Sequence, residues 1–235
     1  MIKTSFWAQE SELLESLMPV RVRSVLLISS LYDSFVFEVD GFLAEQVAED
    51  FYLLNLTNFP NIFHASSIES ALKLLELEKI DLVIVHLSSQ RSIAIDLITM
   101  IKTRDHQLPV YFLLGVPQDL MFIENHQPDL AEVEDFFYWN GDSKLFLAII
   151  KQYEDRANIA HDAAVYDLPI ILVVETFIPY YSQFLPLLYE QVLQLNQSVI
   201  RQEHQDVFKG LYLNTRPRIL LVHSFTEAKL MYENY

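Results

Sequence analysis

The stretch Ile80-Asp-Leu-Val-Ile-Val85 decides the fold. It is apolar at every position after Asp81 and rich in β-branched residues, which favour extended backbone. Strands that are apolar on both faces are typical of parallel sheets covered by helices on each side. A helical period follows over residues 92–103, so the stretch indicates one strand–helix step of an α/β domain.

The same step recurs along the first 158 residues. We expect strands at 24–28, 61–65, 80–85, 109–114 and 135–139, alternating with helices at 34–56, 68–79, 92–103, 117–130 and 143–158. Such alternation predicts a doubly wound parallel sheet with right-handed crossovers. Five strands in this length suit the flavodoxin-like (CheY-like) order 2-1-3-4-5. We therefore predict a domain at 23–158, preceded by a helical extension at 1–22.

A second, shorter unit is predicted at 169–235, after a linker at 159–168. Its strands at 170–174 and 218–222 alternate with helices at 178–202 and 226–234. Val25-Leu-Leu-Ile-Ser-Ser30 aligns with Ile171-Leu-Val-Val-Glu-Thr176, and Ser66–Ser70 aligns with Ser224–Ala228, which indicates a weak internal repeat. The repeat stops after its second helix, so the unit is an incomplete receiver-like unit.

The incomplete unit has a physical consequence. The first strand is central in the order 2-1-3-4-5, so the strand at 170–174 would lack one neighbour, and an apolar open edge is an aggregation hazard. We expect that the chain is a fragment of a longer protein, or that the half-domain borrows a strand from a partner. The fragment is the preferred interpretation.

Charge and composition limit the classes of molecule that we expect the chain to bind. The chain has 16 Lys and Arg against 32 Asp and Glu, a formal charge of −16. Because such a surface repels phosphate backbones and anionic lipid, we expect neither nucleic acid nor a membrane as a partner. We expect a protein partner instead, either a C-terminal enzymatic module or another chain. A homodimer is one possible form of the second alternative. Absence of cysteine excludes disulfides and thiolate chemistry and fits a cytoplasmic protein.

Ligands of such sheets bind beyond the carboxyl ends of the strands. Receivers that accept a phosphoryl group place there two acidic residues, an acceptor Asp, a hydroxyl and a Lys, because metal and Lys must neutralise the accumulating negative charge. Asp81-Leu-Val-Ile-Val-His86-Leu resembles the receiver run D-L-V-I-V-D-L, with His in place of the acceptor. The four positions here hold Ser29 and Ser30, His86, Leu114, and Trp139.

All four positions have changed, so we predict a degenerate pseudo-receiver without catalytic residues, metal or cofactor. His86 could itself be a nucleophile, but a hydrogen-bonded histidine at a strand end is the preferred interpretation. Trp139 fills the vacated pocket either as packing, which we favour, or as a protein contact. In the second unit, Glu175 and Thr176 stand where the acidic pair of a second pocket would lie, and a metal role for Glu175 is the minor alternative.

Several further stretches carry a family resemblance. Ser29–Phe35 with Asp40-Gly41, Trp139-Asn-Gly-Asp142 followed by Leu147–Lys151, and Tyr180-Tyr-Ser182 resemble the N-terminal region of bacterial phosphoenolpyruvate synthase-like (pyruvate phosphate dikinase-like) proteins. In that family, tandem receiver-like domains precede a pyruvate/phosphoenolpyruvate-binding, ATP-grasp-type kinase module. The resemblance implies a regulatory or scaffolding role beside such an enzyme, and no activity in this chain. A receiver with atypical phosphorylation and a small-molecule sensor are the alternatives.

Overall fold

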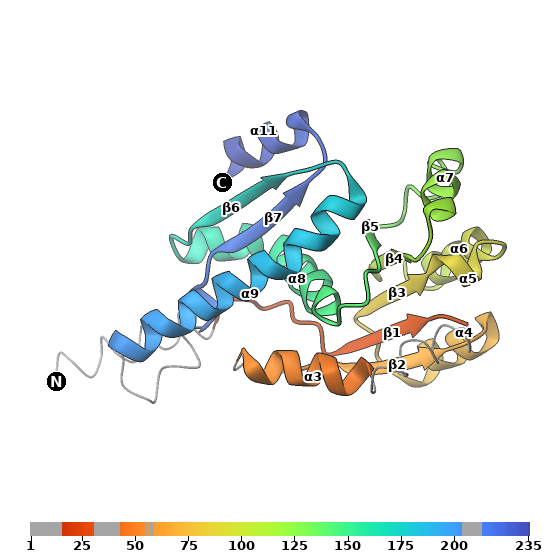
Figure 1. The fold of residues 1–235 in the computed structure, drawn as a ribbon, viewed down its shortest axis with the longest axis horizontal. Helices are drawn as coiled ribbons and strands as arrows, with labels where there is room; N and C mark the ends of the chain where they lie inside the picture. The colour runs from red at the N-terminus through yellow and green to blue at the C-terminus, as the bar shows by residue number, and fades with distance from the viewer. Residues whose placement is uncertain (1–15, 31–42, 55, 57–58, 204–212) are drawn as a thin grey trace. The chain divides into compact units, whose positions relative to one another are not determined.

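A computed structural model describes residues 16–30, 43–54, 56, 59–203 and 213–235 of the chain (Figure 1). These residues divide into two compact units. The first unit comprises Val22–Tyr52 and Asn58–Leu145, and the second comprises Phe146–Tyr235 with short N-terminal segments up to Arg21 and at Leu53–Thr57. Among the described residues, no helix is long and apolar enough to cross a membrane.

The first unit is built on a five-stranded parallel sheet, as the sequence predicted. Its strands in sheet order are β2 (Asn61–Ala65), β1 (Ser24–Ile28), β3 (Leu82–His86), β4 (Val110–Leu114) and β5 (Asp135–Tyr138) (Figure 1). The order 2-1-3-4-5 and the flanking helices confirm the flavodoxin-like α/β fold. Strands β3 and β4 are buried at every residue because neighbours cover both their edges and both their faces.

Capping residues and apolar stripes account for the helices of the first unit. They are α3 (Leu43–Leu53), α4 (Ile68–Leu77), α5 (Leu87–Gln90), α6 (Ala94–Arg104) and α7 (Pro117–Asn125). Ser67 caps α4 as expected, because its Oγ accepts a hydrogen bond of 3.1 Å from the amide of Ser70. Leu43, Val47 and Phe51 form the buried stripe of α3, and the earlier part of the helix predicted from residue 34 lies outside the described residues.

The linker predicted at 159–168 is wrong over most of its length. Helix α8 runs without a break from Lys144 to Val165, and the boundary between the units falls after Leu145 instead of after residue 158. Ile159 is 4% exposed and Asp162 is fully buried. Asp162 also accepts a hydrogen bond of 3.0 Å from the amide of Met18. Buried, partnered residues of this kind stabilise a helix where local sequence looks irregular.

The second unit repeats the first strand pair of the first unit. Its elements after α8 are β6 (Ile170–Val174), α9 (Ile178–Glu203), the short 3₁₀ helix η2 (Leu213–Thr215), β7 (Arg218–Val222) and α11 (Phe225–Asn234). Parallel strands β6 and β7 pair from Ile170↔Arg218 to Val174↔Val222, in the same register as β1 and β2 from Ser24↔Asn61 to Ile28↔Ala65 (Figure 1). The predicted internal repeat is therefore visible in the strand pairing.

One part of the predicted repeat is displaced by a residue. The sequence alignment matched Ser66 with Ser224, but the helix caps match Ser67 with Ser224. Both serines accept a hydrogen bond of 3.1 Å from the amide three residues later. A cap is defined by this bond, so the geometry and not the letter match sets the alignment.

Candidate functional site

The carboxyl ends of β1 and β3 bring Ser29 and His86 to the edge where a receiver holds its acidic groups. Their strands pair through Ile28↔Val85, so the two residues occupy neighbouring positions in the register. Ser29 is fully buried, and its Oγ lies 2.9 Å from Nε2 of His64. His86 is only 5% exposed. Ser30 follows Ser29 and is half-buried. None of the three residues at these predicted positions carries the carboxylate that metal binding or phosphoryl acceptance requires.

A buried carboxylate lies at the same edge, but it comes from another position. Asp119, in the first turn of α7, is fully buried. Its Oδ2 accepts hydrogen bonds from Ser88 Oγ at 2.5 Å and from the amides of Gly115 at 2.9 Å and Val116 at 3.1 Å. Its Oδ1 lies 3.2 Å from Nε of Arg91. Asp119 thus gathers the donors of the loops that follow β3 and β4.

Gly115 places His86 beside this cluster. A Cβ atom built on Gly115 would lie 2.7 Å from Ser88 Oγ and 2.8 Å from His86 Nε2, closer than real Cβ contacts allow. Both side chains therefore pack directly on the glycine backbone. The hydroxyl of Ser88 accepts a hydrogen bond of 3.0 Å from the Gly115 amide. The β3 and β4 ends are locked together by these contacts.

Sequence reasoning missed Asp119, Ser88 and Arg91. The available signal was Pro117-Gln-Asp119, because proline in the first turn followed by an acidic residue marks a helix start. That pattern predicts a capping carboxylate, and it gives no hint of Ser88 or Arg91, which lie in and directly after the short helix α5 that follows β3. The cluster exists only because the parallel strands bring both loops to one edge.

The remaining predicted pocket positions are apolar or aromatic. Leu114 is fully buried at the end of β4, where a receiver has a hydroxyl. Its carbonyl accepts a hydrogen bond of 2.7 Å from the amide of Trp139, which is half-buried beyond the end of β5. Leu114 carries no hydrogen-bond donor, and Trp139 carries only an uncharged indole N–H, so neither supplies the hydroxyl or the positive charge of Ser, Thr or Lys. Within the described residues, no group of three or more acidic, His or Cys side chains is arranged to hold a metal ion.

In the second unit, Glu175 and Thr176 are engaged at the start of α9. Glu175 Oε1 accepts hydrogen bonds from the amides of Thr176 at 2.8 Å and Phe177 at 2.9 Å. Its carbonyl oxygen lies 2.8 Å from Nδ1 of His223. Negative charge is stabilising where a helix begins, because free amides point outward there. The carboxylate is therefore engaged by the turn that precedes α9, and Thr176 is exposed.

A second group of buried charges joins α8 to β7. Arg216 donates to both oxygens of Asp155, at 2.8 and 2.6 Å, and Arg218 donates twice to Asp162 Oδ2, at 2.9 and 2.6 Å. Tyr189 donates its hydroxyl to Asp155 at 3.1 Å. The Arg216–Asp155 contact is bidentate, and both ion pairs are those of a structural tether that leaves little free capacity for a ligand.

The pKa values of this tether follow from burial and pairing. Burial raises the pKa of Tyr189 well above its ordinary value, and the charge of Asp155 adds to the rise. Burial alone would lower the pKa of Arg216, but the Asp155 carboxylate outweighs it, so the pKa is raised. Burial lowers the pKa of Arg218, and repulsion from Arg216 adds to that decrease. An arginine remains charged in either case.

Comparisons with known proteins add little beyond the fold. No family model matches the chain, and no curated protein matches it. Among solved structures, an adenylate cyclase from Rhodopirellula baltica is similar over 62% of this chain and 93% of that one, with a TM-score of 0.40 and 15% sequence identity. The class is defined by the strand order itself: an α/β domain of the flavodoxin-like (CheY-like) fold, followed by a second, smaller sheet.

Proposed function

We propose that the chain is a non-catalytic, receiver-like module that regulates or scaffolds a protein partner. The observation that carries the proposal is Asp119. At the edge where a receiver binds a phosphoryl group, this carboxylate already accepts the bonds of Ser88, Gly115 and Val116 and pairs with Arg91. The donors that would stabilise a transferred phosphoryl group are therefore engaged by the chain itself.

The chemistry of the neighbouring positions supports the same proposal. A phosphoryl group on His86 would add about two negative charges close to Gly115, at an edge that already holds the Asp119 carboxylate. Leu114 and Trp139 offer neither a hydroxyl nor a cation in exchange. The chain's formal charge of −16 further disfavours an additional anion. A role through protein contacts needs none of these groups.

The test is phosphorylation from a small donor. The full chain is incubated with acetyl phosphate and Mg²⁺, and its intact mass is measured at neutral to alkaline pH, where phosphohistidine survives. A receiver that keeps its acceptor Asp serves as the positive control. We expect no species heavier by about 80 Da, the mass of one phosphoryl group. A stoichiometric adduct that disappears in His86→Gln would instead establish a receiver with an atypical acceptor.

We further propose that the partner is a phosphoenolpyruvate synthase-like enzyme, on the resemblance of Ser29–Phe35, Trp139–Asp142 and Tyr180–Ser182 to the N-terminal region of that family. The gene supplies the test. An open reading frame that joins these residues to a kinase module supports this partner. A complete gene that encodes residues 1–235 alone, with no such enzyme encoded beside it, contradicts it.

A further inference from the structure

The outer edge of β6 is unpaired among the residues that the structure describes. Strand β6 pairs with β7 on one side, and no strand among the described residues pairs with its other side. Its five residues, Ile170–Val174, are all apolar and include neither proline nor charge. Natural edge strands are normally protected by proline or charged residues, by bulges or by a covering element. An unprotected apolar edge of this length indicates a binding surface.

The hydrogen-bonding groups of this edge can be assigned. Glu175 donates its amide to Val222 at 3.1 Å, and Pro169 accepts the amide of Arg218 at 3.0 Å, so the odd-numbered residues face β7. Successive backbone groups of a strand alternate between its two edges. The amides and carbonyls of Ile170, Leu172 and Val174 therefore point to the open edge.

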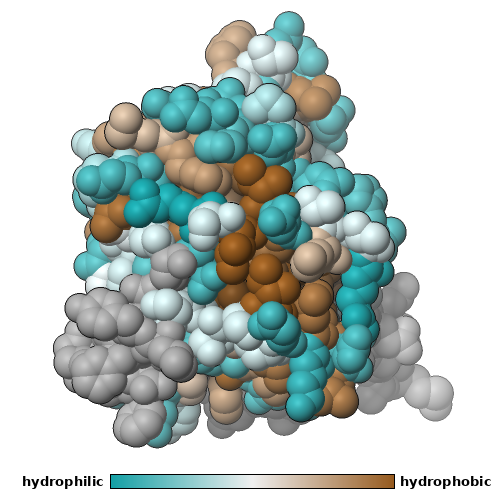
Figure 2. Space-filling view, turned by 90° about the vertical axis from the view of Figure 1, so that its right-hand side faces the viewer, coloured by the Kyte–Doolittle hydropathy of each residue, from teal (hydrophilic) through white to brown (hydrophobic). Residues whose placement is uncertain are grey.

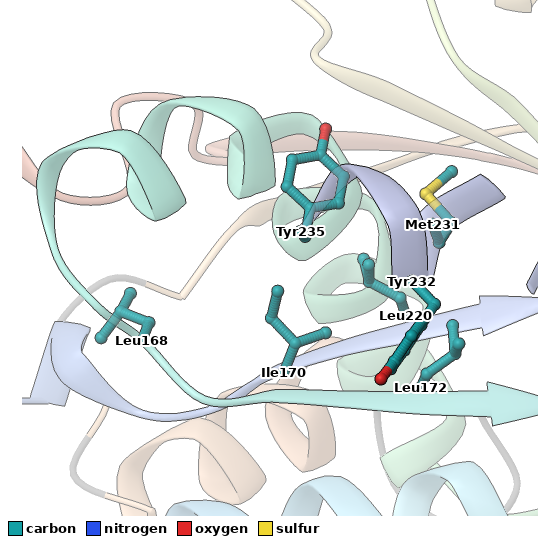
Figure 3. A pocket seen from close by; sticks show the side chains of 7 residues that line it. All are labelled: Leu168, Ile170, Leu172, Leu220, Met231, Tyr232 and Tyr235. Carbon is teal, nitrogen blue, oxygen red and sulfur yellow. The ribbon is translucent and has the colours of Figure 1, made fainter. Parts of the chain in front are cut away.

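An apolar groove lies beside the same edge. It encloses about 440 Å³ and is lined by Ile170, Leu172, Leu220, Met231, Tyr232 and Tyr235, with Leu168 at one end. Figure 3 shows these side chains converging from β6, β7 and the last turns of α11. Tyr232 is 82% exposed and Val174 is 52% exposed. Exposed apolar residues are common elsewhere on this chain too, as the face in Figure 2 shows, but here they adjoin unpaired backbone.

The first unit shows what covers the equivalent edge. Strands β1 and β6 hold their partners β2 and β7 in the same register. The edge of β1 that corresponds to the open edge of β6 carries β3, in parallel, with Val25↔Leu82 through Ile28↔Val85. Helix α6 then lies beside α4, where Arg104 pairs with Glu76 at 3.2 Å. As a result, Val25–Ile28 are 0–3% exposed.

We propose that the open edge of β6 and its groove bind a strand–helix segment of a partner polypeptide. An apolar strand lies parallel to β6, opposite Ile171–Val174, and the apolar face of the following helix fills the groove beside α11. This proposal names the surface of the scaffolding role proposed above. It rests on the geometry of the second unit and is independent of whether His86 accepts a phosphoryl group.

A second copy of the chain fits this surface less well. Two copies related by a two-fold axis would pair their β6 edges antiparallel, which leaves both grooves without a covering helix. Each copy would also bring a formal charge of −16. The inner strands of the first unit, β1, β3 and β4, cannot serve, because they already pair on both edges. A partner segment that resembles β3 and α6 would pair its strand with the edge of β6 and fill the groove with its helix.

The probe is a synthetic peptide with the sequence of residues 79–104, the strand–helix segment that covers β1. It is added to the full chain, and amide hydrogen exchange is followed residue by residue. We expect exchange at Ile170, Leu172 and Val174 to slow at least tenfold at saturating peptide, since backbone pairing protects these amides. A scrambled peptide should leave them unchanged.

Two variants locate the binding. Leu172→Pro removes an amide that faces the open edge and spares the bonds to β7, so the fold should persist while peptide protection is lost. Leu195→Lys, at a 63% exposed position of α9, is the matched control and should bind as the wild type does. Equal behaviour of Leu172→Pro and wild type, or no protection by the peptide, overturns the proposal. Protection that depends on chain concentration alone, with a dimer in sedimentation, assigns the edge to a second copy and also overturns it.

Discussion

Asp119 decides the chemistry of the first unit although its position is not one of those that define a receiver. A buried carboxylate is costly unless it is fully hydrogen-bonded. Here a hydroxyl and two amides donate to Oδ2, whereas Oδ1 accepts no hydrogen bond from the described residues and is offset only by the Arg91 guanidinium, whose Nε lies 3.2 Å away. The same bonds hold the loops after β3 and β4 in one arrangement. A residue that caps α7 thereby engages the hydrogen-bond donors at this edge of the sheet.

Gly115 gives a prediction at the residue scale. Gly115→Ala should lower the free energy of unfolding by about 1–3 kcal/mol, because its Cβ would collide with Ser88 Oγ and His86 Nε2. Urea denaturation followed by tryptophan fluorescence measures the loss. In a His86→Ala background the same substitution should cost less, since one of the two colliding groups is gone. Additive costs would contradict the proposed contact.

Helix α8 shows how an element can depend on groups far along the chain. Asp155 and Asp162 are two turns apart on this helix, and they bind Arg216 and Arg218 at sequence separations of 61 and 56 residues. Asn158 adds contacts of 2.8 and 2.7 Å with the backbone of Val20. Of these three residues, Asp162 lies in the segment predicted as a linker, and its pairing with Arg218 anchors that segment as part of α8.

Asp162 gives a prediction at the element scale. Burial alone would raise the pKa of Asp162, but hydrogen bonds from the Met18 amide, His161 and Arg218 outweigh it, so the pKa is lowered on folding. The carboxylate therefore stabilises the fold above its unfolded pKa of about 3.9, and this contribution is lost as pH falls through the lower folded value. The cost of Asp162→Asn should be largest near neutral pH and should shrink below about pH 4.

The measurement is urea denaturation of wild type and variant at several pH values. Asp167→Asn, at an exposed position just after α8, is the matched control and should cost little at any pH. A cost of Asp162→Asn that stays constant down to pH 3 would show that the ionised carboxylate is not what stabilises α8.

Sequence patterns predicted most elements closely, for a physical reason. The strands at 24–28, 61–65, 170–174 and 218–222 have the predicted bounds, because short runs rich in apolar residues and bounded by polar or turn-forming residues favour a strand. The end of α8 was missed because His161 and Asp162 look polar in sequence. Their neighbours in space, Met18 and Arg218, come from distant segments.

Charge dominates at the scale of the whole molecule. Thirty-two acidic residues against 16 basic ones give a formal charge of −16, and folding concentrates this charge in a compact volume. Self-repulsion of this kind destabilises the compact state and is screened by salt. The paired arginines of the second unit offset only a small part of it.

Salt dependence is the prediction at this scale. Raising NaCl from about 20 to about 500 mM shortens the Debye length severalfold and should raise the melting temperature of the chain. Differential scanning fluorimetry at neutral pH measures the shift, and a series at pH near the sequence pI of about 4.7 is the control, where the effect should be small. A melting temperature that falls with salt at neutral pH would show that attractive surface pairs outweigh the net repulsion.

By itself the sequence determined the fold class, the order of the strands and which residue types stand at their carboxyl ends. Apolar periodicity and residue identity are local properties, so they can be read without a structure. Only the tertiary structure decided that Asp119 engages the donors at the ends of β3 and β4, that α8 continues through most of the expected linker, and that among the described residues β6 has an unpaired edge beside a groove. Each of these depends on which distant backbone and side-chain groups meet, and that is set by the pairing of parallel strands.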